Sequence, residues 1–191
     1  MYVRLLTLMR KKIDQKMLSI YNKEKIKTLI IDQHTKIFVK FENYNLWSEH
    51  KAIFNKTTQN IILSSLNKRI QDKVSISILL TDDIKMREIN LKWRSIDKTT
   101  NILSFPNINI FRENGILNLG DIVISFNTVL DEAKERKILF LDHFRHLLLH
   151  GVLHLLGFDH DNYKSMSIME NLEIEILSNY GIENPYLEKT A

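Results

Sequence analysis

The chain contains no cysteine, which excludes disulfide bonds and zinc sites built from thiolates. It has only two prolines and five glycines in 191 residues, so flexible internal linkers are not expected. No uninterrupted apolar run reaches the about 18 residues that a membrane-spanning helix needs. Hydrophobic residues make up 44% of the chain, which is enough for one sizeable core. These features predict a single cytoplasmic domain without integral membrane association, in which histidine is the only nitrogen ligand for a metal ion.

Charge is unevenly distributed along the chain. The net charge is +4. Residues 1–30 hold eight basic and two acidic side chains, so the rest of the chain carries a net charge of −2. Affinity for a polyanion depends on the phosphates that are neutralised locally. RNA binding therefore has to come from a local patch and not from the overall charge of the domain.

Residues 1–35 are interpreted as a basic N-terminal extension. Apolar residues recur there at roughly helical spacing among lysines and arginines, which is typical of an amphipathic helix lying on RNA or on an anionic membrane. A disordered tail is a second interpretation, since chain ends are commonly poorly ordered. Translation that begins at Met9 or Met17 is a third. The basic residues interrupt the apolar stretch, which argues against a secretory signal.

From residue 36 onwards the hydrophobic periodicity alternates between strand and helix. Strands are expected at 36–42, 74–80, 100–105 and 119–125, and helices at 46–69, 82–93, 128–137, 140–156 and 163–180. Asp82 is the expected N-cap of the second helix. The sequence therefore predicts one domain over residues 36–187 with an α/β (α+β) fold, in which helices pack on a small, mixed, four-stranded sheet.

Three histidines, His150, His154 and His160, stand at H-x3-H-x5-H spacing. The first two are four residues apart, so on a helix their imidazoles project from the same face. Gly157 is expected to end that helix in a left-handed conformation and to turn the third histidine toward the other two. Three imidazoles suit one borderline divalent ion such as Zn²⁺ and leave a fourth coordination position open. The spacing therefore predicts a catalytic zinc site at the end of a helix, in preference to three unrelated core histidines.

The residue after His150 decides which reaction such a site supports. Zinc peptidases with an H-E-x-x-H motif have a glutamate there as general base, whereas this chain has Gly151. A metal ion that activates water and polarises an anionic oxygen suits phosphodiester hydrolysis. Phosphoester chemistry is therefore favoured over peptide hydrolysis.

Four residues near the motif have weaker arguments. Asp159 either accepts a hydrogen bond from a ligand imidazole or caps the turn. His146 lies one turn before His150 on the same helix face and is a candidate outer neighbour that hydrogen-bonds substrate or backbone. His143 is interpreted as a surface residue. Met169 packs either beneath the ion or in the core.

Several further sequence segments occur before and after the motif. Residues 150–160 match H-G-x-L-H-L-x-G-[FY]-D-H at every fixed position. The other segments are 91–94 (L-K-W-R), 100–106 (T-N-I-L-S-F-P), 119–125 (L-G-D-I-V-I-S), 169–170 (M-E) and 184–186 (N-P-Y). Together, over about residues 36–187, they resemble the YbeY family of bacterial endoribonucleases.

The resemblance implies a zinc-dependent endoribonuclease specific for single-stranded RNA. It implies one Zn²⁺ held by His150, His154 and His160, and a contribution of Arg94 to activity. A guanidinium is always charged and grips phosphate oxygens with paired hydrogen bonds. The alternative for Arg94 is a solvated side chain or a partner of Asp97.

The resemblance also implies a cellular role in maturation of the 3′ end of 16S rRNA and in quality control of the 70S ribosome. The implied partners are single-stranded RNA, the small ribosomal subunit and its rRNA, together with a small-subunit ribosomal protein and the GTPase Era. Two other classes of function stay open. One is a non-catalytic ribosome biogenesis factor stabilised by its metal, and the other is a metallopeptidase, which Gly151 disfavours. The attacking group in RNA cleavage is either water or the 2′-hydroxyl of the RNA.

Overall fold

The computed structural model describes residues 26–48, 53–66, 70, 72–107, 112–113 and 115–187. Its strands are β1 (Ile26–Ile30), β2 (Thr35–Phe41), β3 (Lys73–Thr81), β4 (Ile102–Pro106), β5 (Arg112–Glu113) and β6 (Ile116–Ser125). They form one sheet in the order β1-β2-β3-β6-β4, and β5 pairs with the beginning of β6. The strands β2, β3 and β6 are parallel, whereas β1 and β4 are antiparallel to their neighbours. The predicted mixed sheet is confirmed.

The sheet has two strands beyond the four that we predicted. β1 lies within residues 1–35, which we expected to be an extension. It joins β2 through a turn in which Asp32 Oδ1 accepts hydrogen bonds from the amides of His34 and Thr35. β5 has two residues, too few to show a periodicity. Residues 1–25, with the three interpretations given for them, lie outside the described residues.

The helices are α3 (Tyr44–Trp47), α4 (Lys56–Leu66), α5 (Asp83–Arg94), α6 (Phe126–Glu135), α7 (Phe140–Leu155) and α8 (Tyr163–Ser178). Asp82 caps α5 as predicted, because its side chain accepts a hydrogen bond from the Lys85 amide at 2.9 Å. The single helix predicted over 46–69 is wrong. The chain forms α3 and α4 separately, and Asn55 caps α4 by accepting a hydrogen bond from the Thr58 amide at 3.1 Å.

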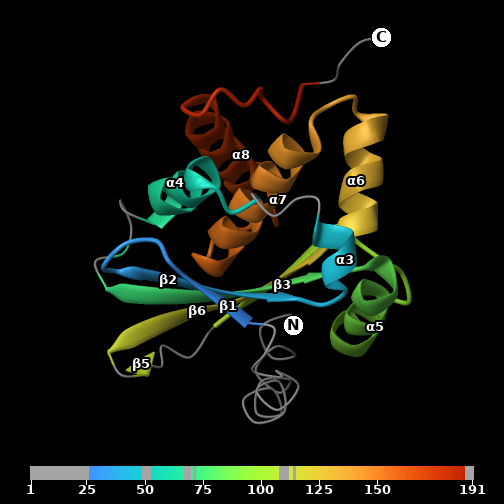
Figure 1. Ribbon diagram of the computed structural model, residues 1–191. Coiled ribbons are helices and arrows are strands. Elements are labelled where there is room, and N and C mark those ends of the chain that lie inside the picture. The colour runs from blue at the N-terminus through green and yellow to red at the C-terminus, as the bar shows by residue number, and fades with distance from the viewer. Residues whose placement is uncertain are drawn as a thin grey trace.

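The larger core lies between one face of the sheet and the helices α4, α6 and α7. Ile78 of β3, Ile122 of β6 and Phe144 of α7 are buried together there. A second cluster, which includes Leu149 and Met169, joins α8 to the outer side of α7. Figure 1 shows α4, α7 and α8 side by side above the sheet. Helix α7 is therefore covered on several sides, which fixes the position of its polar residues.

The opposite face of the sheet packs against α5. Side chains alternate between the two faces of a strand, so Leu79 of β3 and Val123 of β6 face away from α7 and contact Met86 and Ile89 of α5. Figure 1 shows α5 at lower right, apart from the layer that contains α7. Among the described residues, no helix has both the length and the apolar character required to cross a bilayer.

Candidate metal centre

Helix α7 ends in a turn that brings the chain back across its own last residues. Gly157 has a φ of +88°, the left-handed conformation that we predicted. The Phe158 amide donates a hydrogen bond to the carbonyl of Leu153 at 3.0 Å. The Gly157 amide donates to the carbonyl of His154, also at 3.0 Å. This pair of bonds is typical of a helix that ends at a glycine, and it determines where His160 lies.

The three motif histidines lie together at this helix end. Their candidate ligand nitrogens are all within 4.8 Å of one another. The Nε2 atoms of His150 and His154 are 3.0 Å apart. The ring of His160 has its centroid 5.6 Å from that of His150 and 5.0 Å from that of His154. His150 and His154 are partly buried and His160 is exposed, so the cluster opens to solvent on the side of His160.

Two hydrogen bonds decide which ring nitrogens are available to an ion. His150 Nδ1 lies 2.9 Å from Glu173 Oε1, and His154 Nδ1 lies 3.0 Å from the carbonyl oxygen of Phe158. An ionised carboxylate and a carbonyl only accept hydrogen bonds, so both Nδ1 atoms carry a proton. In the neutral rings, both Nε2 atoms are therefore unprotonated.

The facing Nε2 atoms fit a shared cation. Their lone pairs, 3.0 Å apart, repel each other because neither neutral ring has a proton to place between them. A tetrahedral Zn²⁺ with Zn–N distances of about 2.0–2.1 Å separates two ligand nitrogens by roughly 3.3 Å. Burial lowers the pKa of His154, and the neighbouring His150 lowers it further, which favours the neutral form that binds a metal. The residues present fit one divalent ion with an open coordination position.

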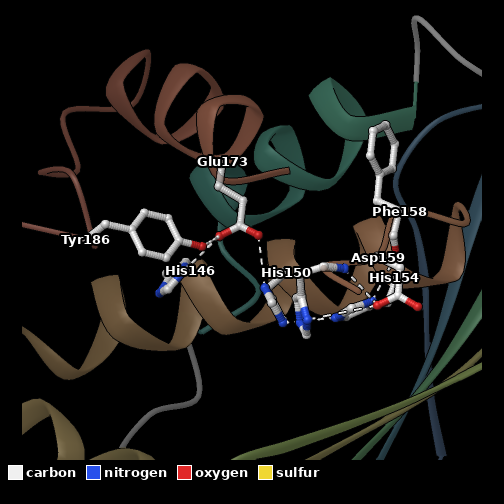
Figure 2. Close-up of polar contacts among 8 residues, drawn as sticks. His146, His150, His154, Phe158, Asp159, Glu173 and Tyr186 are labelled. Atoms are coloured by element: carbon white, nitrogen blue, oxygen red, sulfur yellow. Dashed lines mark hydrogen bonds and ion pairs between the residues drawn. The ribbon is translucent and has the colours of Figure 1, made fainter. Parts of the chain in front are cut away.

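A buried carboxylate on α8 lies behind the cluster. Glu173 is 0% exposed. Besides the bond to His150, it accepts hydrogen bonds on Oε2 from His146 Nε2 at 2.8 Å and from the Tyr186 hydroxyl at 2.5 Å. Figure 2 shows these three side chains directed toward the carboxylate. Burial alone would raise the pKa of Glu173, but the hydrogen bonds from the two histidines lower it to about 2, so the carboxylate is ionised at neutral pH.

Comparison with known proteins agrees with the motif. The sequence pattern of the family described as endoribonuclease YbeY matches residues 40–181, which is most of the chain. The chain belongs to the YbeY family. Endoribonuclease YbeY of Bartonella henselae is 39% identical over 145 residues, which cover 74% of this chain and 91% of that relative. A solution structure from Thermotoga maritima has a TM-score of 0.45 and 20% identity, and covers 75% of this chain and 91% of that one.

Two further histidines, His143 and His146, precede the YbeY motif on α7. His146 Nε2 donates a hydrogen bond to Glu173 Oε2 at 2.8 Å, and the same carboxylate accepts one from His150, so Glu173 links His146 to the cluster. The interpretation of His143 as a surface residue is wrong, since it is 3% exposed and lies 2.7 Å from Glu132 Oε2 through Nε2. Its ring therefore faces α6 and not solvent.

Two further neighbours of the histidines are Asp159 in the motif and Met169 on α8. Asp159 Oδ1 accepts a hydrogen bond from the His160 amide at 2.8 Å and lies 3.9 Å from His160 Nδ1. Met169 is buried among the residues that join α8 to α7, and it also lines the pocket beside His150. Core packing and proximity to the ion site are therefore compatible for this methionine.

Arg94 of the YbeY arginine segment belongs to α5, a different element from the helix that carries the histidines. It is the last residue of α5, on the sheet face opposite α7, and its side chain is exposed. Asp97 is bound by Arg87 at 2.6 and 2.8 Å and is not its partner. Within the described ranges, Arg94 has no hydrogen bond or ion pair. The structure leaves this guanidinium available to a ligand but shows no contact between it and the histidine cluster.

A pocket of about 230 Å³ adjoins the cluster. Its walls include His150 and His160 from the YbeY motif, Met166 and Glu170 from α8, and Tyr186 from the segment that follows α8. Pockets that hold drug-sized molecules are larger, at about 300–1,000 Å³. The available space therefore suits a small chemical group beside the histidines.

Gly151 faces the sheet and not the pocket. A Cβ atom at this position would lie 2.8 Å from Ile102 Cδ1, 3.0 Å from Ser104 Oγ and 3.2 Å from Ile122 Cδ1. The glycine of the YbeY motif thus allows α7 to pack closely on β4 and β6. A glutamate at the position used by H-E-x-x-H peptidases would require these side chains of β4 and β6 to move.

Proposed function

We propose that this protein is a metal-dependent endoribonuclease that cleaves single-stranded RNA and uses one Zn²⁺. The observation that carries the proposal is the convergence of His150, His154 and His160 on one point at the end of α7, beside an open pocket. Membership of the YbeY family gives the substrate class. The close packing at Gly151 argues against the peptidase alternative.

The side chains have separate tasks in this proposal. When bound, a divalent ion lowers the pKa of water and acts as a Lewis acid toward a phosphate oxygen. His150 and His154 present unprotonated Nε2 atoms because their Nδ1 atoms donate to Glu173 and to the Phe158 carbonyl. The pocket between His160 and Tyr186 is small, so an unpaired nucleotide reaches it more easily than a double helix does. This geometry supports a preference for single strands.

The cellular substrate that we propose is the precursor of 16S rRNA, cleaved near its 3′ end, with a further role in 70S ribosome quality control. The support is the resemblance to YbeY enzymes over most of the chain. The proposed partners are the small ribosomal subunit, one of its proteins and the GTPase Era. The cellular location that we propose is the cytoplasm.

We expect removal of the metal to abolish RNA cleavage reversibly. Protein treated with a chelator should lose cleavage of a single-stranded fragment that contains the 3′ end of 16S rRNA, and one equivalent of Zn²⁺ should restore it. The product ends then identify the attacking group. A 5′-phosphate indicates water, and a 2′,3′-cyclic phosphate indicates the 2′-hydroxyl. Cleavage at an unchanged rate in the metal-free protein would contradict the proposed metal dependence.

We expect Arg94→Gln to lower kcat/KM for RNA cleavage by at least about 10-fold, because a charge-assisted hydrogen bond to phosphate contributes about 1.5–3 kcal/mol. The matched control is Arg87→Gln on the same helix, whose guanidinium is bound to Asp97. A lower kcat with unchanged KM places Arg94 at the scissile phosphate, whereas a higher KM places it at another phosphate of the strand. Equal kcat/KM values for Arg94→Gln and the wild type would exclude Arg94 from the reaction.

A further inference from the structure

The carboxylate of Glu173 is shared by three donors from two parts of the chain. His146 and His150 come from successive turns of α7, and Tyr186 comes from the segment after α8. A buried ionised group is costly unless its hydrogen-bonding capacity is used. Here each oxygen of a fully buried carboxylate has at least one donor. These hydrogen bonds therefore form one buried network around Glu173 and not a chance arrangement of surface side chains.

The two carboxylate oxygens have different roles. Among the described residues, Oε1 accepts a hydrogen bond from His150 Nδ1 alone, and this bond fixes the tautomer and direction of the ring. Oε2 accepts both His146 Nε2 and the Tyr186 hydroxyl. Two donors on one oxygen oppose rotation of the carboxylate about its terminal bond. The contacts on Oε2 therefore keep Oε1 directed at His150.

The segment after α8 is itself held against the domain. The guanidinium of Arg136, at the end of α6, donates a hydrogen bond to the carbonyl of Pro185. The Tyr186 amide donates to Asn184 Oδ1 at 2.9 Å, which closes a local turn. The Tyr186 ring packs edge-on against His146, with 5.6 Å between the ring centroids. Residues 184–187, which we call the tail turn, are therefore positioned from two sides.

We propose that Glu173 and Tyr186 are positioning residues of the metal centre, so that the tail turn sets the metal affinity by fixing the carboxylate that orients His150. The proposal depends on the metal site that we propose at the three histidines. Its effect passes from the Tyr186 hydroxyl to Glu173 and from Glu173 to His150 Nε2. Neither residue is a metal ligand in this arrangement, and neither has to contact RNA.

The test is the affinity for Zn²⁺, measured by competition with a chromophoric chelator on the full-length protein. Glu173→Gln should bind Zn²⁺ about 10–100-fold more weakly, the usual effect of losing a residue that orients a ligand histidine. Tyr186→Phe keeps the ring and loses only the hydroxyl, and it should bind on the order of 3–10-fold more weakly. Glu175→Gln, an exposed position on the same helix, should retain wild-type affinity.

A second readout separates positioning from a general loss of structure. In the metal-free protein, the ring ¹⁵N chemical shifts of His150 should show the tautomer protonated at Nδ1 in the wild type. In Tyr186→Phe this tautomer should become less populated while circular dichroism stays unchanged. Tyr186→Phe with wild-type Zn²⁺ affinity and the same tautomer would overturn this proposal alone. A wild type that binds no Zn²⁺ would overturn both this proposal and the metal site. A wild type that binds Zn²⁺ normally but does not cleave RNA would contradict only the proposed function.

Discussion

We expect His154→Ala to reduce the affinity for Zn²⁺ by more than about 100-fold and to abolish RNA cleavage. Loss of a residue that only orients a ligand already costs about 10–100-fold, and His154 is itself one of three candidate ligands. Its Nε2 atom lies 3.0 Å from that of His150. Removing the His154 side chain therefore leaves at most two imidazoles, those of His150 and His160, to bind the ion. Equilibrium dialysis followed by metal analysis measures the effect.

The matched control for this experiment is His34→Ala. His34 is an exposed histidine in the turn between β1 and β2, far from α7 in the topology of the sheet. It should leave the stoichiometry at one Zn²⁺ per chain. Circular dichroism of both variants checks that each has kept its fold. A His154→Ala protein that binds one equivalent of Zn²⁺ as tightly as the wild type would show that the ion lies elsewhere.

We expect Gly151→Glu to destabilise the fold by more than about 3 kcal/mol and to confer no peptidase activity. The substitution recreates the H-E-x-x-H motif in sequence. In the structure its Cβ atom would already lie 2.8 Å from Ile102 Cδ1 and 3.0 Å from Ser104 Oγ. The carboxylate would then be directed between α7 and β4, where an ionised group loses most of its hydration, which costs several kcal/mol. In a domain of this size, 3 kcal/mol corresponds to a Tm lower by roughly 6–12 °C.

Thermal unfolding and a casein cleavage assay together test this expectation. Asn171→Glu adds the same side chain at an exposed position of α8 and should change the Tm little. A folded Gly151→Glu protein with the wild-type Tm would mean that α7 does not pack on the sheet as described. Gain of casein cleavage would mean that the missing glutamate alone separates this site from a peptidase.

Local patterns in the sequence predicted much of the site because its residues are close together in the chain. The four-residue spacing of His150 and His154 and the glycine at position 157 specify a helix with a defined end. Asp82 likewise specifies the beginning of α5 through a bond to an amide three residues away. Each of these features depends on hydrogen bonds within a few residues, so the sequence alone contains the information.

The partners of the histidines could not be predicted in the same way. Glu173 lies 23 residues after His150, and the bond between them exists only because α8 packs on α7. Tyr186 lies in a segment that we matched to the family without assigning it a role. The error for His143 has the same origin, since this buried ring is hydrogen-bonded to Glu132 of another helix, α6. A helix covered on several sides shows no polar face from which such contacts can be read.

The measurement that tests the central claim most directly is cleavage of a single-stranded 16S rRNA fragment by the wild type, His154→Ala and Arg94→Gln, purified by the same procedure. Any contaminating nuclease would be common to all three preparations. Our account predicts cleavage by the wild type, none by His154→Ala and a reduced rate for Arg94→Gln. Equal cleavage by all three, or none by the wild type loaded with Zn²⁺, would contradict a metal-dependent ribonuclease and favour a non-catalytic ribosome biogenesis factor stabilised by its metal.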